Sequence, residues 1–369
     1  TIRHHLGRLE DEYFAAFSLD QMAEDFCDIY ALAPMDPVRV SVTADAGRRI
    51  TCTVVGLDYP AEFSLITGLL AGLGFSVDAG DVFTYDRTTP VASGTAKTRL
   101  NAARLRRIRK AKPDILHRRK IVDRFVGTVA STVDLDRFAT ELTEQLQSVL
   151  SMIETDPQNG PAEARHRVNE RVTRSLGHVD VQQSAVLLPV SVELKTNDRR
   201  RTYLQITGQD TPAFLYSLSN AMALLGMQIE RVRIQTKNSQ VADEIGFVDA
   251  TGLPITDPDA LDRIKLTVLL TKQFTYFLDR SPDPYTAISR FEKMVDDLVR
   301  RDTASNWIDA LSQPKAMRNL GRLLGASDFI WEDFIRLQYE SLLPILHREV
   351  EAGPIAKPPQ TIRARLAEP

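Results

Sequence analysis

The sequence predicts an α+β protein made of two ferredoxin-like units (βαββαβ, antiparallel sheets) with an N-terminal helix and a C-terminal helical segment. The main observation is a repeat: GLDYPAEFSLITGLLAGLGFSV begins at Gly56, and GQDTPAFLYSLSNAMALLGMQI begins at Gly208. Each copy reads as strand, turn, helix and strand, with two strand candidates before it and a further strand and helix after it. Such a repeat decides the domain organisation before other features are weighed.

Length and composition agree with more than one domain. The chain has 369 residues, 43% hydrophobic and 26% charged, which is ordinary for a globular protein too long for one core. A net charge of −3 disfavours binding of nucleic acid by the whole chain. Cys27 and Cys52 form neither a metal spacing nor a disulfide framework, which fits a reducing compartment. No apolar run is long enough to span a membrane, so we expect a cytoplasmic chain without membrane contact.

The first half is expected to hold a helical lead-in at residues 1–35 and the first unit at 36–155. A single helix over 8–32 is predicted, with a capping box formed by Ser18 and Gln21. Two strands, a helix ending at Gly74, two further strands and a helix follow. The predicted ranges are 38–42, 48–57, 60–74, 75–85, 120–129 and 134–153.

A basic insertion at residues 87–117 interrupts the first unit. From Lys97 to Arg124 there are twelve Lys or Arg and two Asp, a local net charge of +10. Charge runs usually form a solvated surface, and no aromatic residue is interleaved here for base stacking. We therefore favour a solvated excursion over nucleic-acid contact, with an intramolecular dock for an acidic partner domain as an intermediate interpretation.

The second half is divided into three predicted parts. A connecting helix at 156–182 follows the turn PQNGP, the second unit covers 183–285, and a helical segment covers 286–369. The chain starts at Thr1 and ends in a charged tail, which is typical of a piece of a longer protein.

The two turns align residue by residue at an offset of 152 positions: Asp58 and Asp210, Pro60 and Pro212, Ala61 and Ala213. An Asp at the N-cap accepts hydrogen bonds from free helix amides, and Pro suits the first turn. The remaining amides and the helix dipole attract a carboxylate. The turns are therefore candidate sites for an anionic group.

Both copies resemble the ACT domain, a small-molecule sensor module with the hallmark Asp-Arg-Pro-Gly-Leu-Leu, an apolar helix and Gly-Leu-Asn-Ile. The matching stretches here are D-Y-P-A-E-F with G-F-S-V, and D-T-P-A-F-L with G-M-Q-I. The second copy is similar to the C-terminal ACT domain of the uridylyltransferase that modifies the PII signal protein. HHLGRLEDEYFAAFSLDQMAEDF resembles the helix that leads into that enzyme's ACT pair.

The resemblance implies ligand-binding residues at both turns and at the strand starts that face them across a domain pair. For the turns, the implied residues are Asp58, Pro60, Ala61, Glu62, Phe63, Asp210, Thr211, Pro212, Ala213, Phe214 and Leu215. For the strand starts, they are Gly74, Phe75, Ser76, Gly226, Met227 and Gln228.

The chain departs from the ACT pattern at two places. Ala replaces the family Gly in both turns, and a Cβ atom there disfavours positive φ. Glu62 adds a negative charge where an anionic group would sit, so binding is expected more at the second turn than at the first. The competing interpretation is that both turns only begin well-capped helices.

KAMRNLGRLLGASDFIWEDFIRLQYESLLPIL resembles the helical start of glutamine synthetase adenylyltransferase. A nucleotidyltransferase core needs a Gly-Ser turn followed by an Asp-x-Asp pair that holds Mg²⁺. The nearest candidate, VGTVASTVDLD, has Asp134 and Asp136 at the start of a helix, where N-capping by Asp134 explains them better. We therefore expect no catalytic residue, no metal site and no cofactor in this chain.

Together the two resemblances imply a regulatory region that senses an amino acid, glutamine first, in nitrogen signalling by protein nucleotidylylation. Its expected partners are an attached or separate nucleotidyltransferase domain, PII or glutamine synthetase, and a second copy paired through ACT sheets. The alternative is an interaction or dimerisation scaffold without a ligand. An enzyme in its own right is the least favoured interpretation.

Overall fold

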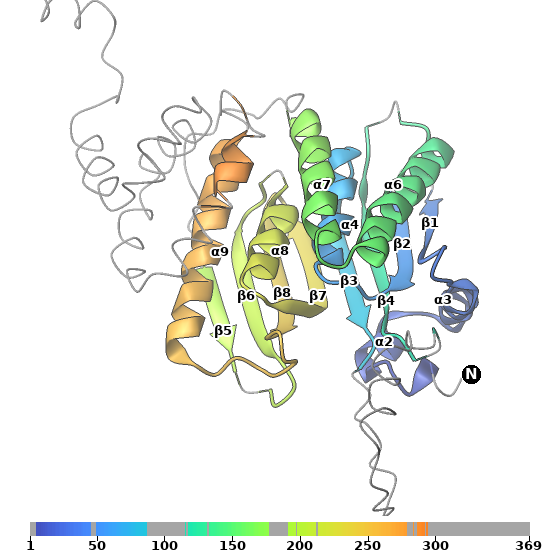
Figure 1. Ribbon diagram of the computed structural model, residues 1–369, viewed down its shortest axis with the longest axis horizontal. Coiled ribbons are helices and arrows are strands. Elements are labelled where there is room, and N and C mark those ends of the chain that lie inside the picture. Colours follow the sequence, from blue (N-terminus) through green and yellow to red (C-terminus); the bar gives the residue numbers. More distant parts are fainter. Residues whose placement is uncertain are drawn as a thin grey trace, which may run out of the picture.

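The computed structural model describes residues 5–45, 49–86, 115, 117–130, 133–176, 191–196, 198–211, 213–278, 283, 286–291 and 293. Most of the basic insertion and of the C-terminal helical segment lie outside the described residues. Figure 1 shows these helices and strands: α2 Asp11–Ala16, α3 Leu19–Ala31, β1 Val38–Ala44, β2 Ile50–Leu57, α4 Glu62–Gly72, β3 Ser76–Thr84, β4 Lys120–Thr128, α6 Leu135–Thr155, α7 Gly160–Leu176, β5 Ser191–Lys195, β6 Thr202–Gln209, α8 Phe214–Leu224, β7 Gln228–Lys237, β8 Gln240–Val248 and α9 Pro258–Leu278.

All the labelled strands belong to one antiparallel sheet in the order β1-β2-β4-β3-β7-β8-β6-β5. The first four strands form one half and the last four the other, and β3 pairs with β7 at the junction. The predicted α+β class with tandem ferredoxin-like units is thereby confirmed. Along the chain each unit runs ββαββα, which is the ferredoxin-like plan with its last strand moved to the front. The predicted domain boundaries stay predictions.

The two units are related by a local two-fold axis between β3 and β7. In the register of this pair Asp81 lies opposite Arg233, which is the residue 152 positions later. On the helix side, the hydroxyls of Thr67 on α4 and Ser219 on α8 lie 3.4 Å apart, again at an offset of 152. The two copies of the repeat therefore face each other, and the turn of each copy lies opposite the other unit.

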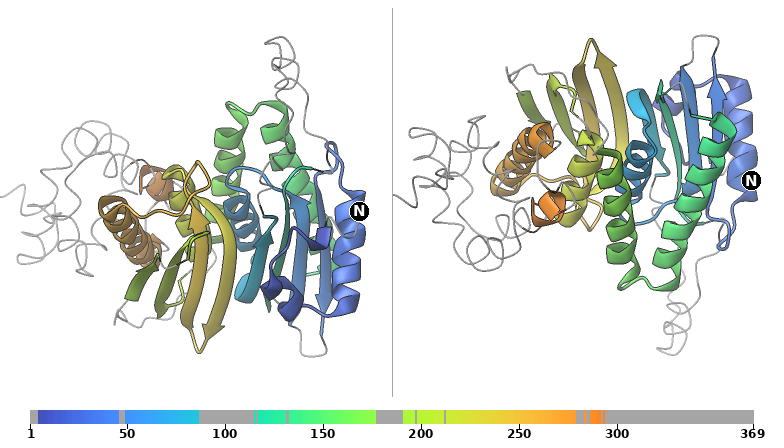
Figure 2. Two further views of the ribbon diagram at one scale, coloured as in Figure 1. Left: turned by 90° about the horizontal axis from the view of Figure 1, so that it is seen from below. Right: turned by 90° about the horizontal axis from the view of Figure 1, so that it is seen from above.

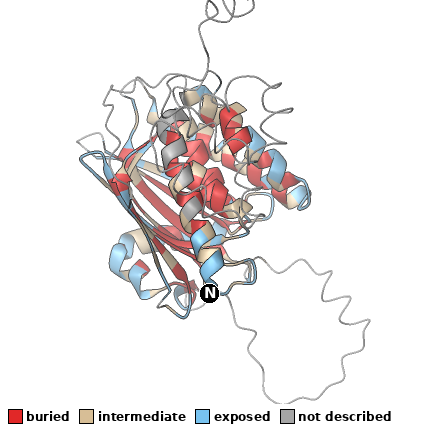
Figure 3. Cartoon of the chain, turned by 90° about the vertical axis from the view of Figure 1, so that its left-hand side faces the viewer, coloured by how far each residue is buried: buried red, intermediate tan, exposed pale blue. Residues whose placement is uncertain are grey.

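One face of the sheet carries the helices α4, α6, α7, α8 and α9 (Figure 2). Phe125 of β4 stacks on Phe63 of α4 at this face, with ring centroids 6.4 Å apart. The neighbouring Arg124 points to the other face, where its guanidinium lies 3.9 Å from the ring centroid of Phe17. Buried residues concentrate between the sheet and its helices (Figure 3). No helix in the described part of the chain is long and apolar enough to cross a membrane.

The prediction of one N-terminal helix over 8–32 is wrong. The structure has two short helices, α2 and α3, separated at Phe17, whose backbone is extended. Phe17 packs on Phe83 of β3, with ring centroids 5.5 Å apart, so burial of this ring outweighs continuation of the helix. The capping box of Ser18 and Gln21 is confirmed as the start of α3.

The prediction that Asp58 and Asp210 are helix N-caps is also wrong. The N-caps of α4 and α8 are Ala61 and Ala213, and neither makes a side-chain capping bond. Both alanines have positive φ, 62° and 53°, although a Cβ atom disfavours that conformation. The same strained turn therefore occurs twice, which indicates that the surrounding packing holds it.

Two predicted helix ends are confirmed. Gly74 follows the end of α4 with φ +77°, as expected for a glycine just beyond a helix. The carboxylate of Asp134 accepts a hydrogen bond of 2.9 Å from the amide of Arg137, so Asp134 is the N-cap of α6.

Candidate functional site

The second turn, residues 210–215, opens onto a cavity of about 310 Å³ between the two units, the second cavity. Its opposite wall is formed by the start of β3 in the first unit and by Val172 and Ser175 of α7. The predicted residues that line it are Asp210, Thr211, Ala213, Phe214, Leu215, Gly74, Phe75 and Ser76. Pro212 lies outside the described residues.

The first turn, residues 58–63, opens onto a smaller cavity of about 180 Å³, the first cavity. Its opposite wall is the start of β7 in the second unit. The predicted residues that line it are Asp58, Pro60, Ala61, Glu62, Phe63, Met227 and Gln228. Gly226 lines neither cavity; its φ of +75° is that of a glycine just beyond the end of α8.

Two carboxyl groups line the second cavity. Asp243 of β8 is 2% exposed, and its Oδ1 accepts a bond of 3.2 Å from the amide of Gln235. Its Oδ2 has no hydrogen-bond partner among the described residues, and burial raises the pKa of Asp243 to about 7. Asp210 is exposed at the turn, yet desolvation by the surrounding protein raises its pKa against the attraction of Lys272.

Lys272 of α9 is the cation that faces these two carboxyl groups. Its Nζ donates to the hydroxyl of Thr211 at 3.2 Å and lies 3.6 Å from the ring centroid of Phe214. Burial lowers the pKa of Lys272 to about 8, and Asp210 and Asp243 oppose that shift. Lys272 and the two carboxyl groups therefore form a cluster of mixed charge beneath the second turn, in which the carboxyl groups line the second cavity and the buried Lys272 lies behind its wall.

The first cavity has a different electrostatic arrangement. Glu62 is 7% exposed, and its Oε2 accepts a bond of 2.6 Å from the amide of Tyr59 in the same turn. Burial, followed by Asp58 and Asp123, raises the pKa of Glu62 well above its ordinary value. Burial likewise raises the pKa of Asp123, which is fully buried on β4.

Asp123 and Asp243 occupy equivalent places in the two units. Asp123 lies opposite Val54 in the sheet, and Asp243 lies opposite Ile206, which is 152 positions after Val54. Sequence reasoning missed both because the basic insertion changes their spacing to 120 residues. The available signal was an Asp at a core-facing position of an otherwise apolar strand. Lys272, in the helix TVLLTKQF, gave a similar signal.

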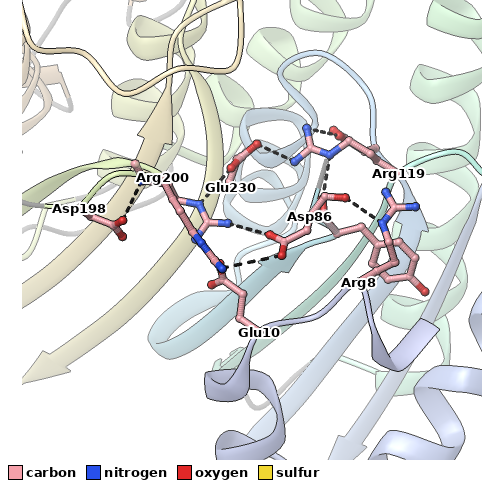
Figure 4. Close-up of polar contacts among 10 residues, drawn as sticks. Arg8, Glu10, Asp86, Arg119, Asp198, Arg200 and Glu230 are labelled. Carbon is pink, nitrogen blue, oxygen red and sulfur yellow. Dashed lines mark hydrogen bonds and ion pairs between the residues drawn. The ribbon is translucent and has the colours of Figure 1, made fainter. Parts of the chain in front are cut away.

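An ion-pair network extends from the first turn to the N-terminal segment (Figure 4). Arg119 pairs with Asp58 at 3.1 Å and with Glu230 of β7 at 2.7 Å. Glu230 then pairs with Arg201 of β6 at 3.0 Å, and Arg201 pairs with Glu10 at 2.6 Å. Since Arg201 is only 4% exposed, loss of either partner would leave a buried charge without compensation. The network thus ties both units to the N-terminal lead-in.

Within the described residues, no group of three or more His, Cys, Asp or Glu side chains has a geometry that could hold a metal ion. The predicted absence of a cofactor stays a prediction. Cys27 is exposed, Cys52 is buried, and both are free thiols.

Comparison with known proteins finds distant similarity to bifunctional uridylyltransferase/uridylyl-removing enzymes. The chain is 27% identical over 163 residues to that of Gluconobacter oxydans (40% of this chain, 16% of the relative). It is 25% identical over 230 residues to that of Rhodopseudomonas palustris (61% and 20%), and 23% identical over 235 residues to that of Azospirillum brasilense (63% and 21%).

The chain thus spans about a fifth of the length of the curated relatives it matches. No protein-family model matches the chain, and no solved structure matches it. The similarity relates this chain to a region of a nucleotidyltransferase.

Proposed function

We propose that this chain is a regulatory, tandem ACT-like region that senses an amino acid, glutamine first, for a nitrogen-signalling nucleotidyltransferase. The internal repeat, the strained turn in both units and the distant similarity to uridylyltransferases support this proposal. An attached or separate nucleotidyltransferase domain would receive the signal, with PII or glutamine synthetase as the protein partners.

The second cavity is the observation on which the proposal depends. An amino acid there would place its carboxylate at the amides that begin α8, on the side of the cavity behind which Lys272 is buried. Its ammonium group would lie near Asp210 and Asp243. Because the walls of the cavity come from both units, a ligand would favour the arrangement in which they are closest.

The test is thermal unfolding of the chain with each common amino acid at millimolar concentration. A ligand at about 100 times its dissociation constant stabilises the folded state by about 2.7 kcal/mol. We expect glutamine to raise the unfolding temperature of the unmodified chain. The response should be lost in Asp210→Asn, which removes the exposed carboxylate at the second turn.

Asp58→Asn is the matched control, because it makes the same change at the first turn and should keep the response. A variant at Gln228 would not test the second cavity, since this side chain lines the first. An unchanged unfolding temperature with every amino acid would contradict amino-acid sensing and favour the scaffold function.

One observation favours a protein-interaction scaffold as the second candidate. Three large apolar side chains on or just after α3 are strongly exposed: Leu19 82%, Tyr30 74% and Met35 91%. Exposed apolar groups on neighbouring parts of the chain are typical of an interaction surface. If this function holds, Leu19→Ser with Tyr30→Ser should abolish any concentration-dependent association seen by sedimentation, without an effect on amino-acid responses.

A further inference from the structure

At the first turn, a cation lies between two acids that come from different units. The guanidinium of Arg119 pairs with Asp58 of the first turn at 3.1 Å and with Glu230 of the second unit at 2.7 Å. Glu230 lies at a register shift of β7, between Ile229 and Arg231. Such an irregularity turns a side chain out of the regular alternation of the strand. Arg119 thereby joins the turn of one unit to a strand of the other.

The local two-fold axis places an equivalent pair of acids at the second turn. Asp210 corresponds to Asp58 and Asp78 corresponds to Glu230, each at the offset of 152. Asp78 also lies at a register shift, in β3. Burial, opposed by Lys272, raises the pKa of Asp210, and the nearby charge of Asp78 adds to this rise. The second turn therefore faces an acid of the first unit.

Both of these strand acids lie just beyond a cavity wall. Asp78 directly follows Ser76 and Val77, which line the second cavity. In the same way, Glu230 follows two strand residues that line the first cavity. Arg119 lines that cavity and reaches Glu230 from it. A cation in the second cavity has the same path to Asp78.

A serine stands in the second unit where the first has this arginine. The amide of Asp58 donates to the carbonyl of Arg119 at 3.0 Å, and the amide of Asp210 donates to the carbonyl of Ser239 at 2.9 Å. These matching bonds identify Ser239 as the counterpart of Arg119. Its short side chain carries no charge and cannot bridge two acids as a guanidinium does.

The neighbouring cations do not take over this bridge. Arg49 reaches Asp78 at 4.0 Å, and its side chain is 53% exposed. Lys272 acts on Asp210 from the buried side of the cavity wall. Among the described residues, neither cation forms an ion pair with both acids. The second turn thus has the two acids of the first turn without the group that joins them.

A buried oxygen of the second cavity also lacks a partner. Asp243 lines the cavity and is 2% exposed. Its Oδ1 accepts from the amide of Gln235, whereas Oδ2 has no hydrogen-bond partner among the described residues. Buried carboxyl oxygens normally have one, whether the carboxyl group is charged or neutral. A polar ligand in the cavity would supply it.

We propose that the amino acid in the second cavity is held through its ammonium group, which lies between Asp210 and Asp78. The Arg119 guanidinium has this position between Asp58 and Glu230. The inference rests on the proposed function and adds Asp78, from the other unit, as a binding residue. The first unit fills the position with its own side chain, and the second leaves it to a ligand. The ligand would then join the second turn to the first unit.

The experiment is thermal unfolding and calorimetric titration of the full chain with L-glutamine and with 4-carbamoylbutanoate, which is glutamine without its ammonium group. We expect glutamine to bind and 4-carbamoylbutanoate not to bind at the same concentrations. Asp78→Asn should weaken glutamine binding about tenfold, because a neutral acceptor replaces a charged one.

Asp81→Asn is the matched control. Asp81 lies on the same strand, is 34% exposed as Asp78 is, and pairs with Arg231 at 3.1 Å. Its loss should leave glutamine binding unchanged.

Two results would overturn the inference and leave amino-acid sensing standing: Asp78→Asn binds glutamine as the unmodified chain does, or 4-carbamoylbutanoate binds as tightly as glutamine. If glutamine does not bind the unmodified chain, the proposed glutamine sensing fails and the inference fails with it. If Asp78→Asn does not fold, comparison of the two compounds on the unmodified chain decides.

Discussion

The two units of this chain have the same backbone turn, but the groups around the buried acid on the strand beneath it differ. Both begin their helix with an alanine of positive φ, and both place an Asp on the strand beneath. In the second unit, Phe214 lies against Lys272, which faces the acids. In the first, Glu62 folds back onto the amide of its own turn. A repeat can therefore keep its scaffold while one side chain changes the electrostatics of its cavity.

The outer faces of the two halves differ as well. The strand β2 is buried along nearly its whole length because helices cover both of its faces. Its counterpart β6 alternates between buried and more accessible positions, which shows that one face of that half is open. The N-terminal lead-in thus covers only the first unit, and the network through Arg201 attaches it to the second.

The largest expected effect separates the buried ion pairs of the network that links the two units to the N-terminal segment from the exposed ion pairs beside them. Arg201→Met should reduce the free energy of unfolding by about 3–5 kcal/mol, because Glu10 and Glu230 lose a buried partner. Arg200→Met is the matched control; that side chain is 67% exposed, so its loss should cost about 0–1 kcal/mol. Urea unfolding of both variants measures this difference. Equal losses in the free energy of unfolding would contradict the role of burial.

A second prediction uses the pH dependence of stability to test the buried Asp that each unit has at the equivalent strand position. Asp243 has a pKa of about 7 in the folded chain, above its ordinary value near 3.9. Between these values the folded state keeps a proton that the unfolded state has lost, so stability falls as pH rises. Since Asn does not titrate, Asp243→Asn should gain up to about 4 kcal/mol over the unmodified chain from about pH 4 to pH 7.

Urea unfolding at several pH values measures this gain. Asp123→Asn should give a difference of the same sign, because burial also raises the pKa of Asp123. A constant difference between variant and unmodified chain across this range would mean that Asp243 does not titrate as its surroundings require.

A third prediction concerns the close contact at the local two-fold axis, where the units are not equivalent. Gly68 of α4 corresponds to Asn220 of α8, and a Cβ at Gly68 would lie 2.3 Å from Val168 Cγ1 and 2.7 Å from Tyr216 Cδ2. Gly68→Ala should therefore destabilise the chain by about 1–3 kcal/mol, despite the better helix propensity of Ala. Adding Val168→Ala should restore part of the loss; no recovery would place the strain elsewhere.

The smallest expected effect lies at the pair of hydroxyls on the same axis. Ser219→Ala should cost about 0.5–1 kcal/mol, mainly from the bond of 2.7 Å to the carbonyl of Leu215. A double-mutant cycle with Thr67→Val measures whether the 3.4 Å contact between the hydroxyls adds to this. A coupling energy above about 1 kcal/mol would mean that the contact between the two hydroxyls contributes to holding the units together.

Local features of this protein could be predicted from the sequence alone. The repeat, the strands, the capping box at Ser18, the cap at Asp134 and the helix end at Gly74 depend on neighbouring residues, and the structure confirms them. The turn and strand-start residues of the two cavities could also be selected, because they recur at a constant offset, whereas Asp243 and the walls from α7 could not.

Only the tertiary structure decided which charges meet. Lys272 reaches Asp243 from a helix beyond the repeat, and Arg119 reaches Asp58 across the basic insertion. The break at Phe17 depends on a ring from β3, and the turn at Ala61 takes a conformation that its own side chain disfavours. The sequence determines the short-range preferences of each segment. The pKa values, the ion pairs and the strained turns depend on contacts between distant segments, which exist only after the sheet register brings them together.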